Sequence, residues 1–357
     1  MPAYRLTADC IWSSFRSSGK RHLILTGGRG TGKTELLKQL FPEATSGLTT
    51  WAKPKQAVYL QDNRSGETVQ VGVFDETLPG PGNQMVPVQD GFLAVGVPAL
   101  ERCMVSDSAW VTIDEIGYLE AQCIPYHKAL RKLLEKKQAA MVVRKQDLPF
   151  LNELCRREDV FVVDLDDPFG NIGCVIMASG LGKRFGGNKL MADFHGKPMI
   201  SRILDATEGI FARRVVVTRS SEVAELCHGR GIQTVLHTLP HRSDTVRLGL
   251  EAMPGMERCM FAASDQPLLR RETVAALALA AANGTDYIWR TGYDGEQGNP
   301  VVFPGWCFPE LLDLPEGKGG GILIKKYPAQ LRRVTVRDMY ELKDVDSPED
   351  LSELLER

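Results

Sequence analysis

Short runs of apolar residues, bounded by glycine or polar residues, recur along the whole chain and alternate with stretches of helical apolar spacing. The apolar runs are residues 22–26, 110–113, 139–143, 160–163, 174–177, 214–217 and 260–263. Helical spacing is clear at residues 126–136 and 271–282. Continuous apolar runs between helices are typical of parallel strands that helices bury on both faces. The pattern therefore predicts α/β folds in both halves of the chain.

Three segments depart from this pattern. Residues 49–74 alternate in β fashion around Gln61-Asp-Asn-Arg-Ser-Gly66, which predicts an antiparallel hairpin. Residues 79–83, Pro-Gly-Pro-Gly-Asn, predict a flexible surface loop. The polar segment 164–171 carries proline and glycine and predicts a domain boundary. Because single cores rarely exceed about 250–300 residues, the chain of 357 residues is expected to form two domains, 1–166 and 172–357.

Composition narrows the class of partner. Lys and Arg number 43 against 45 Asp and Glu, for a net charge of −2, so no overall positive field is available for nucleic acid or anionic lipid. No apolar run approaches the roughly 18 residues that span a bilayer, and the first residues lack a signal-peptide core. A cytoplasmic protein with small-molecule partners is expected. The eight cysteines form no CxxC pair, which argues against zinc and favours reduced thiols.

The first chemical motif follows the first apolar run. Residues 27–34, Gly-Gly-Arg-Gly-Thr-Gly-Lys-Thr, stand between that run and a helical stretch, as a phosphate-binding P-loop requires. Glycines at this position let backbone N–H groups wrap phosphates. Lys33 can reach the β- and γ-phosphates, and the Thr34 hydroxyl can ligate Mg²⁺. The loop glycines expected to hold ATP or GTP are Gly27, Gly30 and Gly32.

A second motif supplies acids at the end of the run that begins at residue 110. Asp114 is expected to hold the metal and Glu115 to polarise the attacking water, although such a pair alone also serves as a helix cap. Arg144 and Lys145 follow the next apolar run and either stabilise charge on the transferred phosphate or are simply solvated.

These residues resemble a known family. The matching segments are TGGRGTGKTELL, SGLTTWAKPKQAVYLQDNRSGE and WVTIDEIGYLE. They resemble the small P-loop nucleoside-triphosphatases first described from thermophiles, over roughly residues 20–165. The resemblance implies a mainly parallel sheet and NTP hydrolysis.

The second half repeats the arrangement of strand, glycine-rich loop and acid. The run at 174–177 leads into a loop in which Gly180 and Gly182 permit close backbone approach. Arg184 and Lys189 can neutralise phosphate charge there. Asp265 ends another strand, where α/β sheets bind ligands, and can hold Mg²⁺. A glycine-rich basic loop alone can also be a plain connection; the strand-terminal acid favours a second triphosphate site.

This half also resembles a family. The matching segments are MASGLGKRFGGNKLMADFHGKPM, SDQPLL, GNPVVF, GKGGGILIKKYP and DVDSPEDL. They resemble the MobA-like NTP transferases, the nucleotidylyltransferases of molybdenum cofactor maturation, almost throughout 172–357. The resemblance implies a Rossmann-like fold of the nucleotide-diphospho-sugar transferase type. It further implies that Ala178, Ser179 and Gly180 line the base and ribose, that Arg184 and Lys189 bind the phosphates, that Asp265 binds the metal, and that Asn299, Gly319 and Asp346 complete the pocket for acceptor or metal.

Within this resemblance the loop favours CTP over GTP, since Ala-Ser-Gly at 178–180 and Ser-Asp-Gln-Pro at 264–267 are nearer to the cytidylyl branch. Ser243, Asp244 and Thr245 begin a predicted helix and either read a pyrimidine edge or only cap the helix.

The leading hypothesis is a fused enzyme that transfers CMP from CTP to molybdopterin and releases pyrophosphate. One alternative is a cytidylyl or uridylyl transferase for a sugar or polyol phosphate. Another is a P-loop assembly factor that delivers the cofactor to a recipient molybdoenzyme. His195, His237 and His241 are expected to be surface or packing residues rather than ligands.

Overall fold

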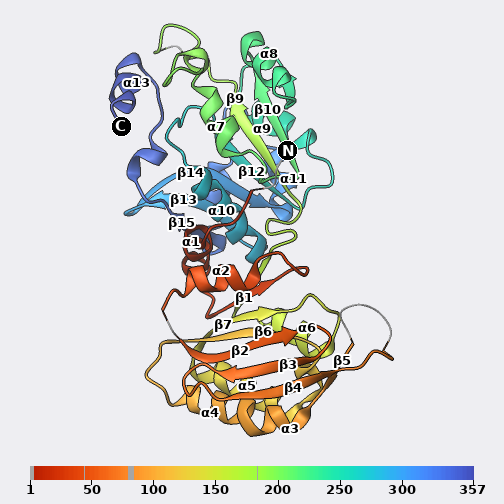
Figure 1. Cartoon of the computed structure of the whole chain (residues 1–357). Coiled ribbons are helices and arrows are strands. Elements are labelled where there is room, and N and C mark those ends of the chain that lie inside the picture. Colours follow the sequence, from red (N-terminus) through yellow and green to blue (C-terminus); the bar gives the residue numbers. More distant parts are fainter. Residues whose placement is uncertain (1–3, 44, 79–83, 183) are drawn as a thin grey trace. The chain divides into compact units, whose positions relative to one another are not determined.

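The computed structural model describes residues 4–43, 45–78, 84–182 and 184–357, and the chain divides into two compact units (Figure 1). One unit is Gly19–Pro168, and the other combines Met1–Ser18 with Phe169–Arg357. The division at Pro168 falls inside the predicted boundary segment. Residues 1–18, which we expected in the N-terminal domain, belong instead to the C-terminal unit.

Helix α1 (Ala8–Ser18) explains this difference. It packs against α10 (Arg271–Asn283) and against β15 (Leu331–Thr335). Ile11 is fully buried in this contact, and the Ser14 hydroxyl donates to the carbonyl oxygen of Ala276 at 2.9 Å. The sequence of a single amphipathic helix indicates which of its faces is apolar, but it does not indicate which of two cores that face will cover.

The N-terminal unit is built on an eight-stranded sheet in the order β5-β4-β3-β2-β6-β7-β1-β8. The strands are β1 (His22–Thr26), β2 (Ser46–Lys53), β3 (Ala57–Asp62), β4 (Thr68–Phe74), β5 (Met85–Pro87), β6 (Trp110–Ile116), β7 (Gln138–Val143) and β8 (Val160–Asp164). Neighbouring strands in the series β2-β6-β7-β1-β8 pair in parallel. Neighbouring strands in the series β2-β3-β4-β5 pair antiparallel. The predicted hairpin is confirmed as β3 and β4. The loop predicted at 79–83 lies outside the described residues.

Helices cover this sheet around a core of aliphatic side chains from β1, β6 and β7. They are α2 (Lys33–Leu40), α3 (Gln89–Gly91), α4 (Val97–Met104), α5 (Ile124–Lys136) and α6 (Pro149–Cys155), with a π-helical turn at Phe92–Gly96 between α3 and α4 and a 3-10 turn at Glu120–Gln122. The parallel strands bring the loops after β1 and β6 to the same edge of the sheet, which positions the P-loop beside the predicted acids.

The C-terminal unit has a seven-stranded sheet in the order β11-β10-β9-β12-β14-β13-β15. Its other strands are β9 (Ile172–Ala178), β10 (Arg213–Thr218), β11 (Gln233–Leu236), β12 (Arg258–Ala263), β13 (Ile288–Tyr293) and β14 (Glu296–Pro304). Its other helices are α7 (Ile200–Ala206), α8 (Ser221–Gly229), α9 (Arg242–Glu251), α11 (Phe308–Leu312), α12 (Gly321–Lys326) and α13 (Pro348–Leu355), with 3-10 turns at Lys189–Met191, Gly305–Cys307, Pro328–Gln330 and Met339–Leu342. The expected two-domain α/β fold is confirmed.

The parallel strands β9, β10 and β12 end at one edge of this sheet, so the loops that follow them converge there. Strand β14 runs antiparallel to β12 with Val301 opposite Phe261. Asn299, two residues before Val301, therefore lies beside the end of β12, close to Asp265. This convergence brings together site residues that are far apart in the sequence.

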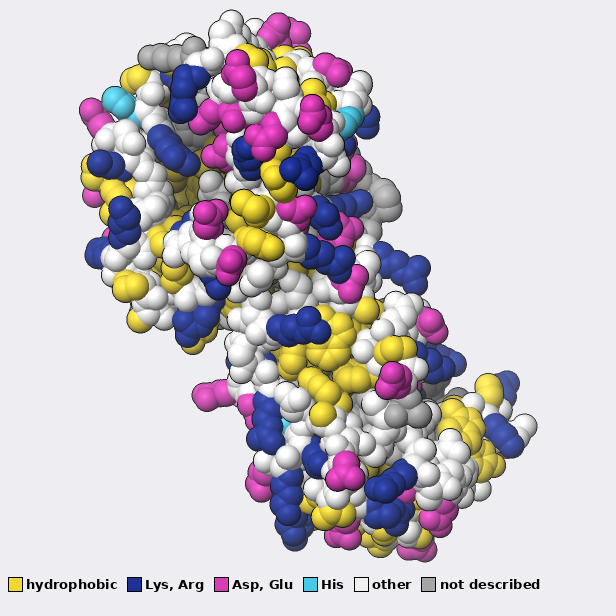
Figure 2. Space-filling view, turned by 90° about the vertical axis from the view of Figure 1, so that its left-hand side faces the viewer, with side chains coloured by type: hydrophobic (Ala, Val, Ile, Leu, Met, Phe, Trp, Pro, Cys, Tyr) yellow, Lys and Arg dark blue, Asp and Glu magenta, His cyan; other side chains and the backbone are white. Residues whose placement is uncertain are grey.

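Charge and thiol chemistry agree with the composition. Figure 2 shows Lys and Arg side chains interspersed with Asp and Glu on the face in view. All eight cysteines are free thiols. Among the helices that the structure describes, none has the length and apolar character needed to cross a membrane.

Candidate functional site

The P-loop joins β1 to α2 and has the backbone shape that its glycines permit. Gly27, Gly30 and Gly32 have φ values of +137°, +80° and +88°, which side chains strongly disfavour. The Lys33 ammonium group donates to the carbonyl oxygens of Gly27 and Gly28 at 2.9 and 2.6 Å. The lysine therefore folds back over the loop, where a bound phosphate would meet it.

The two residues predicted to hold magnesium in this unit contact each other. The Thr34 hydroxyl donates to Oδ1 of Asp114 at 3.1 Å. Burial raises the pKa of Asp114, and the hydrogen bond from Thr34 partly opposes that rise. A hydroxyl and a carboxylate held together at the start of α2 are suitable oxygen ligands for a hard cation.

The neighbouring acid, Glu115, is held by Arg144, whose Nε donates to its carboxylate. The Arg144 guanidinium also lies 5.8 Å from the centre of the Tyr118 ring. Burial alone would lower the pKa of Arg144, but the contact with Glu115 outweighs it and the pKa is raised. Arg144 is thus paired rather than simply solvated.

Lys145 is paired as well. Its ammonium group lies 2.7 Å from Asp164 and 3.0 Å from Asp166. The Asp166 carboxylate also accepts the backbone N–H of Gly28, at 3.0 and 3.1 Å from its two oxygens. That N–H and Lys145 lower the pKa of Asp166. Asp166 could not be singled out from the sequence, since an acid in a polar linker has no distinctive spacing.

In the C-terminal unit, Lys189 is the centre of a charged cluster. It is only 7% exposed, and its ammonium group donates to Oδ2 of Asp265 at 2.7 Å and to the Val345 carbonyl at 2.6 Å. Oδ1 of Asp346 lies 3.3 Å away. Burial would lower the pKa of Lys189, but the two carboxylates outweigh it and the pKa is raised. The lysine is therefore held as a cation among acids.

The acids come from two places in the sequence. Asp265 follows β12, whereas Asp344 and Asp346 precede α13, and the Val345 N–H donates to the Asp265 carbonyl at 2.9 Å. Partial burial, together with Asp265 and Asp346, raises the pKa of Asp344 to about 6. Asp344 was not among the site residues predicted from the sequence. Its signal was the Asp-Val-Asp alternation, which in an extended segment directs both acids to one side.

A pocket of about 350 Å³ opens above this cluster. The predicted residues that line it are Ser179, Gly180, Lys189, Thr245, Asp265 and Asn299. Its other lining residues, to which the sequence assigned no binding role, include Arg219, His241, Arg242 and Asp344.

Three predicted loop residues have other positions. Arg184 is 78% exposed and pairs with Asp346 at 3.1 Å, at the edge of the cluster. Ala178 is buried at the end of β9, outside the lining. Gly182 shapes the loop, because its φ is +55° and a Cβ there would lie 2.7 Å from the Gly187 carbonyl oxygen. Lys183, the third cation of the predicted loop, lies outside the described residues.

Ser179 is fixed by its neighbours. Its hydroxyl donates to the Val217 carbonyl at 3.1 Å and lies 2.8 Å from Nε2 of His237. The Arg219 guanidinium donates to the Ser179 carbonyl at 2.8 and 2.6 Å. His237 thus packs behind the loop rather than lining the pocket, as expected of a packing residue.

The start of α9 is capped by one of its own side chains and also borders the pocket. Asp244 accepts the backbone N–H of His241 at 3.1 Å and so caps the helix. Thr245 lines the pocket, whereas Ser243 and Asp244 are not among its lining residues. Only Thr245 of the three is placed to contact a ligand.

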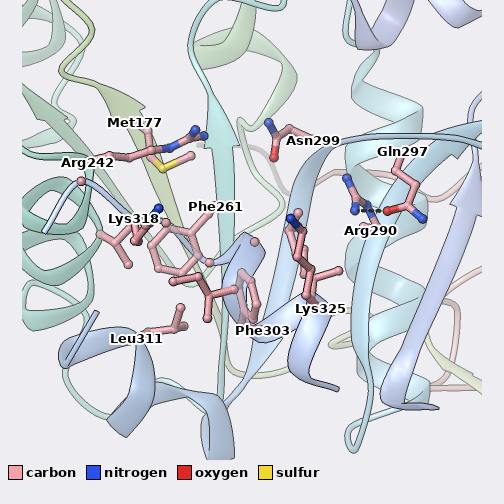
Figure 3. Close-up of a pocket in the computed structure, with 18 residues that line it drawn as sticks. Met177, Arg242, Phe261, Arg290, Gln297, Asn299, Phe303, Leu311, Lys318 and Lys325 are labelled. Atoms are coloured by element: carbon pink, nitrogen blue, oxygen red, sulfur yellow. Dashed lines mark hydrogen bonds between the residues drawn. The ribbon is translucent and has the colours of Figure 1, made fainter. Parts of the chain in front are cut away.

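A second pocket of about 470 Å³ adjoins the first and shares Met177, Arg242 and Asn299 with it (Figure 3). The glycine run at 317–321 forms part of its wall, which places the predicted Gly319 here. A Cβ on Gly319 would lie 3.2 Å from Nε of Arg242, so the glycine leaves room for that side chain. Asn299 thus contributes to the walls of both pockets.

Comparison with known proteins matches each half of the chain to a family. Residues 174–333 match the MobA-like NTP transferase domain, and residues 56–168 match the NTPase family. Both resemblances seen in the sequence are thereby confirmed.

Individual relatives differ in activity. A 3-deoxy-manno-octulosonate cytidylyltransferase from Neisseria gonorrhoeae (strain NCCP11945) is 33% identical over 160 residues, which are 42% of this chain and 62% of that protein. A probable molybdenum cofactor guanylyltransferase from Aquifex aeolicus is 28% identical over 102 residues, 28% of this chain and 49% of that protein. The chain thus spans less than two-thirds of either relative's length. The crystal structure of THEP1 from Aquifex aeolicus is 20% identical, with a TM-score of 0.35, and the match covers 40% of this chain and 89% of THEP1.

Proposed function

We propose that this chain, which contains a MobA-like NTP transferase domain and an NTPase domain, transfers CMP from CTP to a phosphorylated acceptor, molybdopterin, and releases pyrophosphate. The observation that supports this most strongly is the position of Lys189. Its ammonium group is buried between Asp265 and Asp346 at the base of the first pocket. A cation and carboxylates at the strand ends are the groups that nucleotidyl transfer requires.

The proposed reaction is a direct displacement. A phosphate oxygen of the acceptor attacks the α-phosphorus of CTP and forms a new P–O bond. The bond from the α-phosphorus to the bridging oxygen breaks, and pyrophosphate leaves with that electron pair. Lys189 and Arg184 stabilise the negative charge that develops on the α-phosphate and on the leaving group. No covalent bond to the protein is required.

The residues present fit a magnesium ion at this site. Asp265 and Asp346 both direct carboxylate oxygens at Lys189, so their oxygens converge on one region. Within the described ranges, no group of three or more His, Cys, Asp and Glu side chains forms a ready-made metal site. Mg²⁺ is commonly held by one or two carboxylates together with substrate phosphates. When bound here, it would neutralise phosphate charge.

The choice of CTP is supported by the loop sequence and by one relative. The fixed Ser179 and the adjacent Gly180 line the pocket, and the Neisseria relative is a cytidylyltransferase by name. The same relative favours a second candidate function, cytidylyl transfer to a sugar-type acceptor instead of molybdopterin.

The N-terminal domain is proposed to hydrolyse ATP or GTP, with Lys33 on the phosphates, Thr34 and Asp114 on Mg²⁺, and Glu115 polarising the attacking water. The contact between Thr34 and Asp114 supports this assignment. Delivery of the product to a recipient molybdoenzyme stays a prediction from resemblance.

Pyrophosphate release tests the proposed function. The full chain is incubated with molybdopterin and, separately, with CTP, GTP or ATP. We expect release with CTP that depends on molybdopterin and is lost in the Asp265→Asn variant. Equal release without acceptor, or release with GTP alone, would reject the proposal. Activity with CTP and 3-deoxy-manno-octulosonate, but not with molybdopterin, would favour the second candidate.

A further inference from the structure

The second pocket is lined by positive charge without acidic neighbours. Arg242, Arg290, Lys318 and Lys325 contribute to its wall, and none of its described lining residues is Asp or Glu. Figure 3 shows Arg242 and Lys318 on one side of the opening and Arg290 and Lys325 on the other. The chain as a whole carries a net charge of −2. A group of four cations without acids is therefore a local feature of this pocket.

Arg290 is the most constrained of these cations. It lies on β13, and one terminal nitrogen donates to Oε1 of Gln297 at 2.6 Å (Figure 3). The other terminal nitrogen donates to the carbonyl of Gly298 at 3.0 Å. Its Nε is buried and has no hydrogen-bond partner among the described residues. Both observed partners are neutral, so the guanidinium charge has no counter-ion in these contacts.

The sheet supplies no counter-charge either. Arg290 is paired with Val301 on β14 and with Arg333 on β15, which is itself a cation. Like charges opposite each other on neighbouring strands are destabilising. Burial lowers the pKa of Arg290, so its charged form is less favourable in the protein without a ligand than it is in water.

A half-buried guanidinium without a counter-ion in these contacts is costly to keep charged, and it is explained most simply when a ligand supplies the opposite charge. A purely structural alternative is that Arg290 only ties Gln297 and Gly298 to β13. Two neutral hydrogen bonds account for its terminal nitrogens, but they do not account for the positive pocket around it.

The remaining walls indicate the rest of the ligand. Phe261, Phe303 and Leu311 form an apolar surface. Arg290 lines only the second pocket, whereas Asn299 lines both. Because Arg290 donates to the carbonyl of Gly298, which directly precedes Asn299, an anionic group bound at Arg290 would lie near Asn299, and the apolar surface would contact the rest of the ligand.

We infer that the second pocket binds the acceptor through a carboxylate or similar oxyanion, and that Arg290 neutralises this group. The identification of the ligand as the acceptor rests on the proposed function; the anion site itself does not. A flat heterocyclic acid and a sugar acid share this chemistry.

Direct binding measurements on the full chain test the inference without any transfer reaction. One arm measures fluorescence anisotropy of pterin-6-carboxylate against uncharged pterin. The other arm measures calorimetric binding of 3-deoxy-manno-octulosonate against mannose. Both arms use the wild type, Arg290→Gln, Arg290→Lys and the matched control Arg333→Gln, which removes the same charge from the neighbouring exposed strand position.

We expect at least one acid to bind the wild type at least tenfold more tightly than its neutral partner. Arg290→Gln should remove that preference, Arg290→Lys should restore part of it, and Arg333→Gln should leave it unchanged. The arm that responds identifies the acceptor class. The inference is overturned if neither acid binds the wild type, if acid and neutral ligand bind equally, or if Arg290→Gln keeps the preference. Arg290-dependent binding without CMP transfer would instead count against the proposed function alone.

Discussion

Replacement of Lys189 by methionine removes the cation of the transferase cluster while keeping a side chain of similar length. The ammonium group contacts Asp265, Asp346 and the Val345 carbonyl, so all three acceptors lose a donor at once. The variant therefore perturbs both the stability of this unit and the proposed chemistry.

The loss of stability follows from how exposed the partners are. Breaking a fully buried ion pair costs about 3–5 kcal/mol. The side chains of Asp265 and Asp346 are 24% and 44% exposed, so water takes over part of the contact. We therefore expect the variant to lose about 2 kcal/mol of unfolding free energy at pH 8.

The pH dependence gives this prediction its sign. The folded-state pKa of Lys189 is raised, so its stabilisation is complete below the unfolded value of about 10.4 and is lost only as pH rises through the higher folded value. In the wild type, the contribution of Lys189 to the unfolding free energy is therefore constant from about pH 5 to about pH 8, well below both pKa values. Lys189 lowers the pKa of Asp344, so without the lysine Asp344 takes up a proton more readily, and the deficit of the variant should shrink as pH falls from about 8 to about 5.

Hydrogen exchange of amides in β9 and β12 measures the stability of this unit within the full chain. Lys197→Met serves as the control, because Lys197 is 60% exposed and lies 3.8 Å from Asp205. The Lys189→Met variant should lose roughly a hundredfold in CMP transfer, since removal of a charge stabiliser costs on the order of 3 kcal/mol. An equal deficit at both pH values, or near-normal turnover in folded protein, would refute the reasoning.

Three further predictions concern other parts of the chain. Lys33→Ala in the full chain should abolish NTP hydrolysis by removing the charge that meets the β- and γ-phosphates. A unit comprising residues 1–18 joined to 169–357, which lacks Lys33, should transfer CMP at the rate of the full chain; a transferase rate that requires the other unit contradicts this independence. Ile11→Ala should lower the stability of the C-terminal unit by about 2–4 kcal/mol, because Ile11 is fully buried. Amide exchange in β6 of the other unit should not change. A loss of stability below about 0.5 kcal/mol would show that α1 contributes little. The pKa of Asp344 is raised to about 6, so its charge destabilises the fold above that pH. Asp344→Asn should therefore be more stable than the wild type by about 1 kcal/mol at pH 8 but not at pH 4, as measured by amide exchange in β12. Equal stability of the two proteins at pH 8 would argue against repulsion in the cluster.

The two glycine-rich loops and the acids beside them were predictable from the sequence, because each motif is local and needs particular residue types. Gly27 and Gly32 meet a backbone requirement that the sequence displays directly. Lys189 and Asp265 are 76 residues apart in the chain, yet each stands in a recognisable context of loop or strand end.

Other features depend on tertiary placement that no local pattern encodes. The attachment of α1 to α10 is decided by which apolar face is free in the folded unit. Asp344 becomes a pocket residue because Val345 pairs with the chain at Asp265. The isolation of Arg290 from counter-ions is visible only when its neighbours on β14 and β15 are known.

Transfer of label from the α-phosphate of the nucleotide to the acceptor tests the central claim most directly. The full chain is given molybdopterin and equal concentrations of CTP and GTP, with the α-phosphate labelled in one nucleotide at a time. Recovery of the label in a molybdopterin product from CTP, at least tenfold above that from GTP and absent in Lys189→Met, is the result that the account predicts. Label recovered from GTP alone, or from neither nucleotide in folded protein, would contradict it.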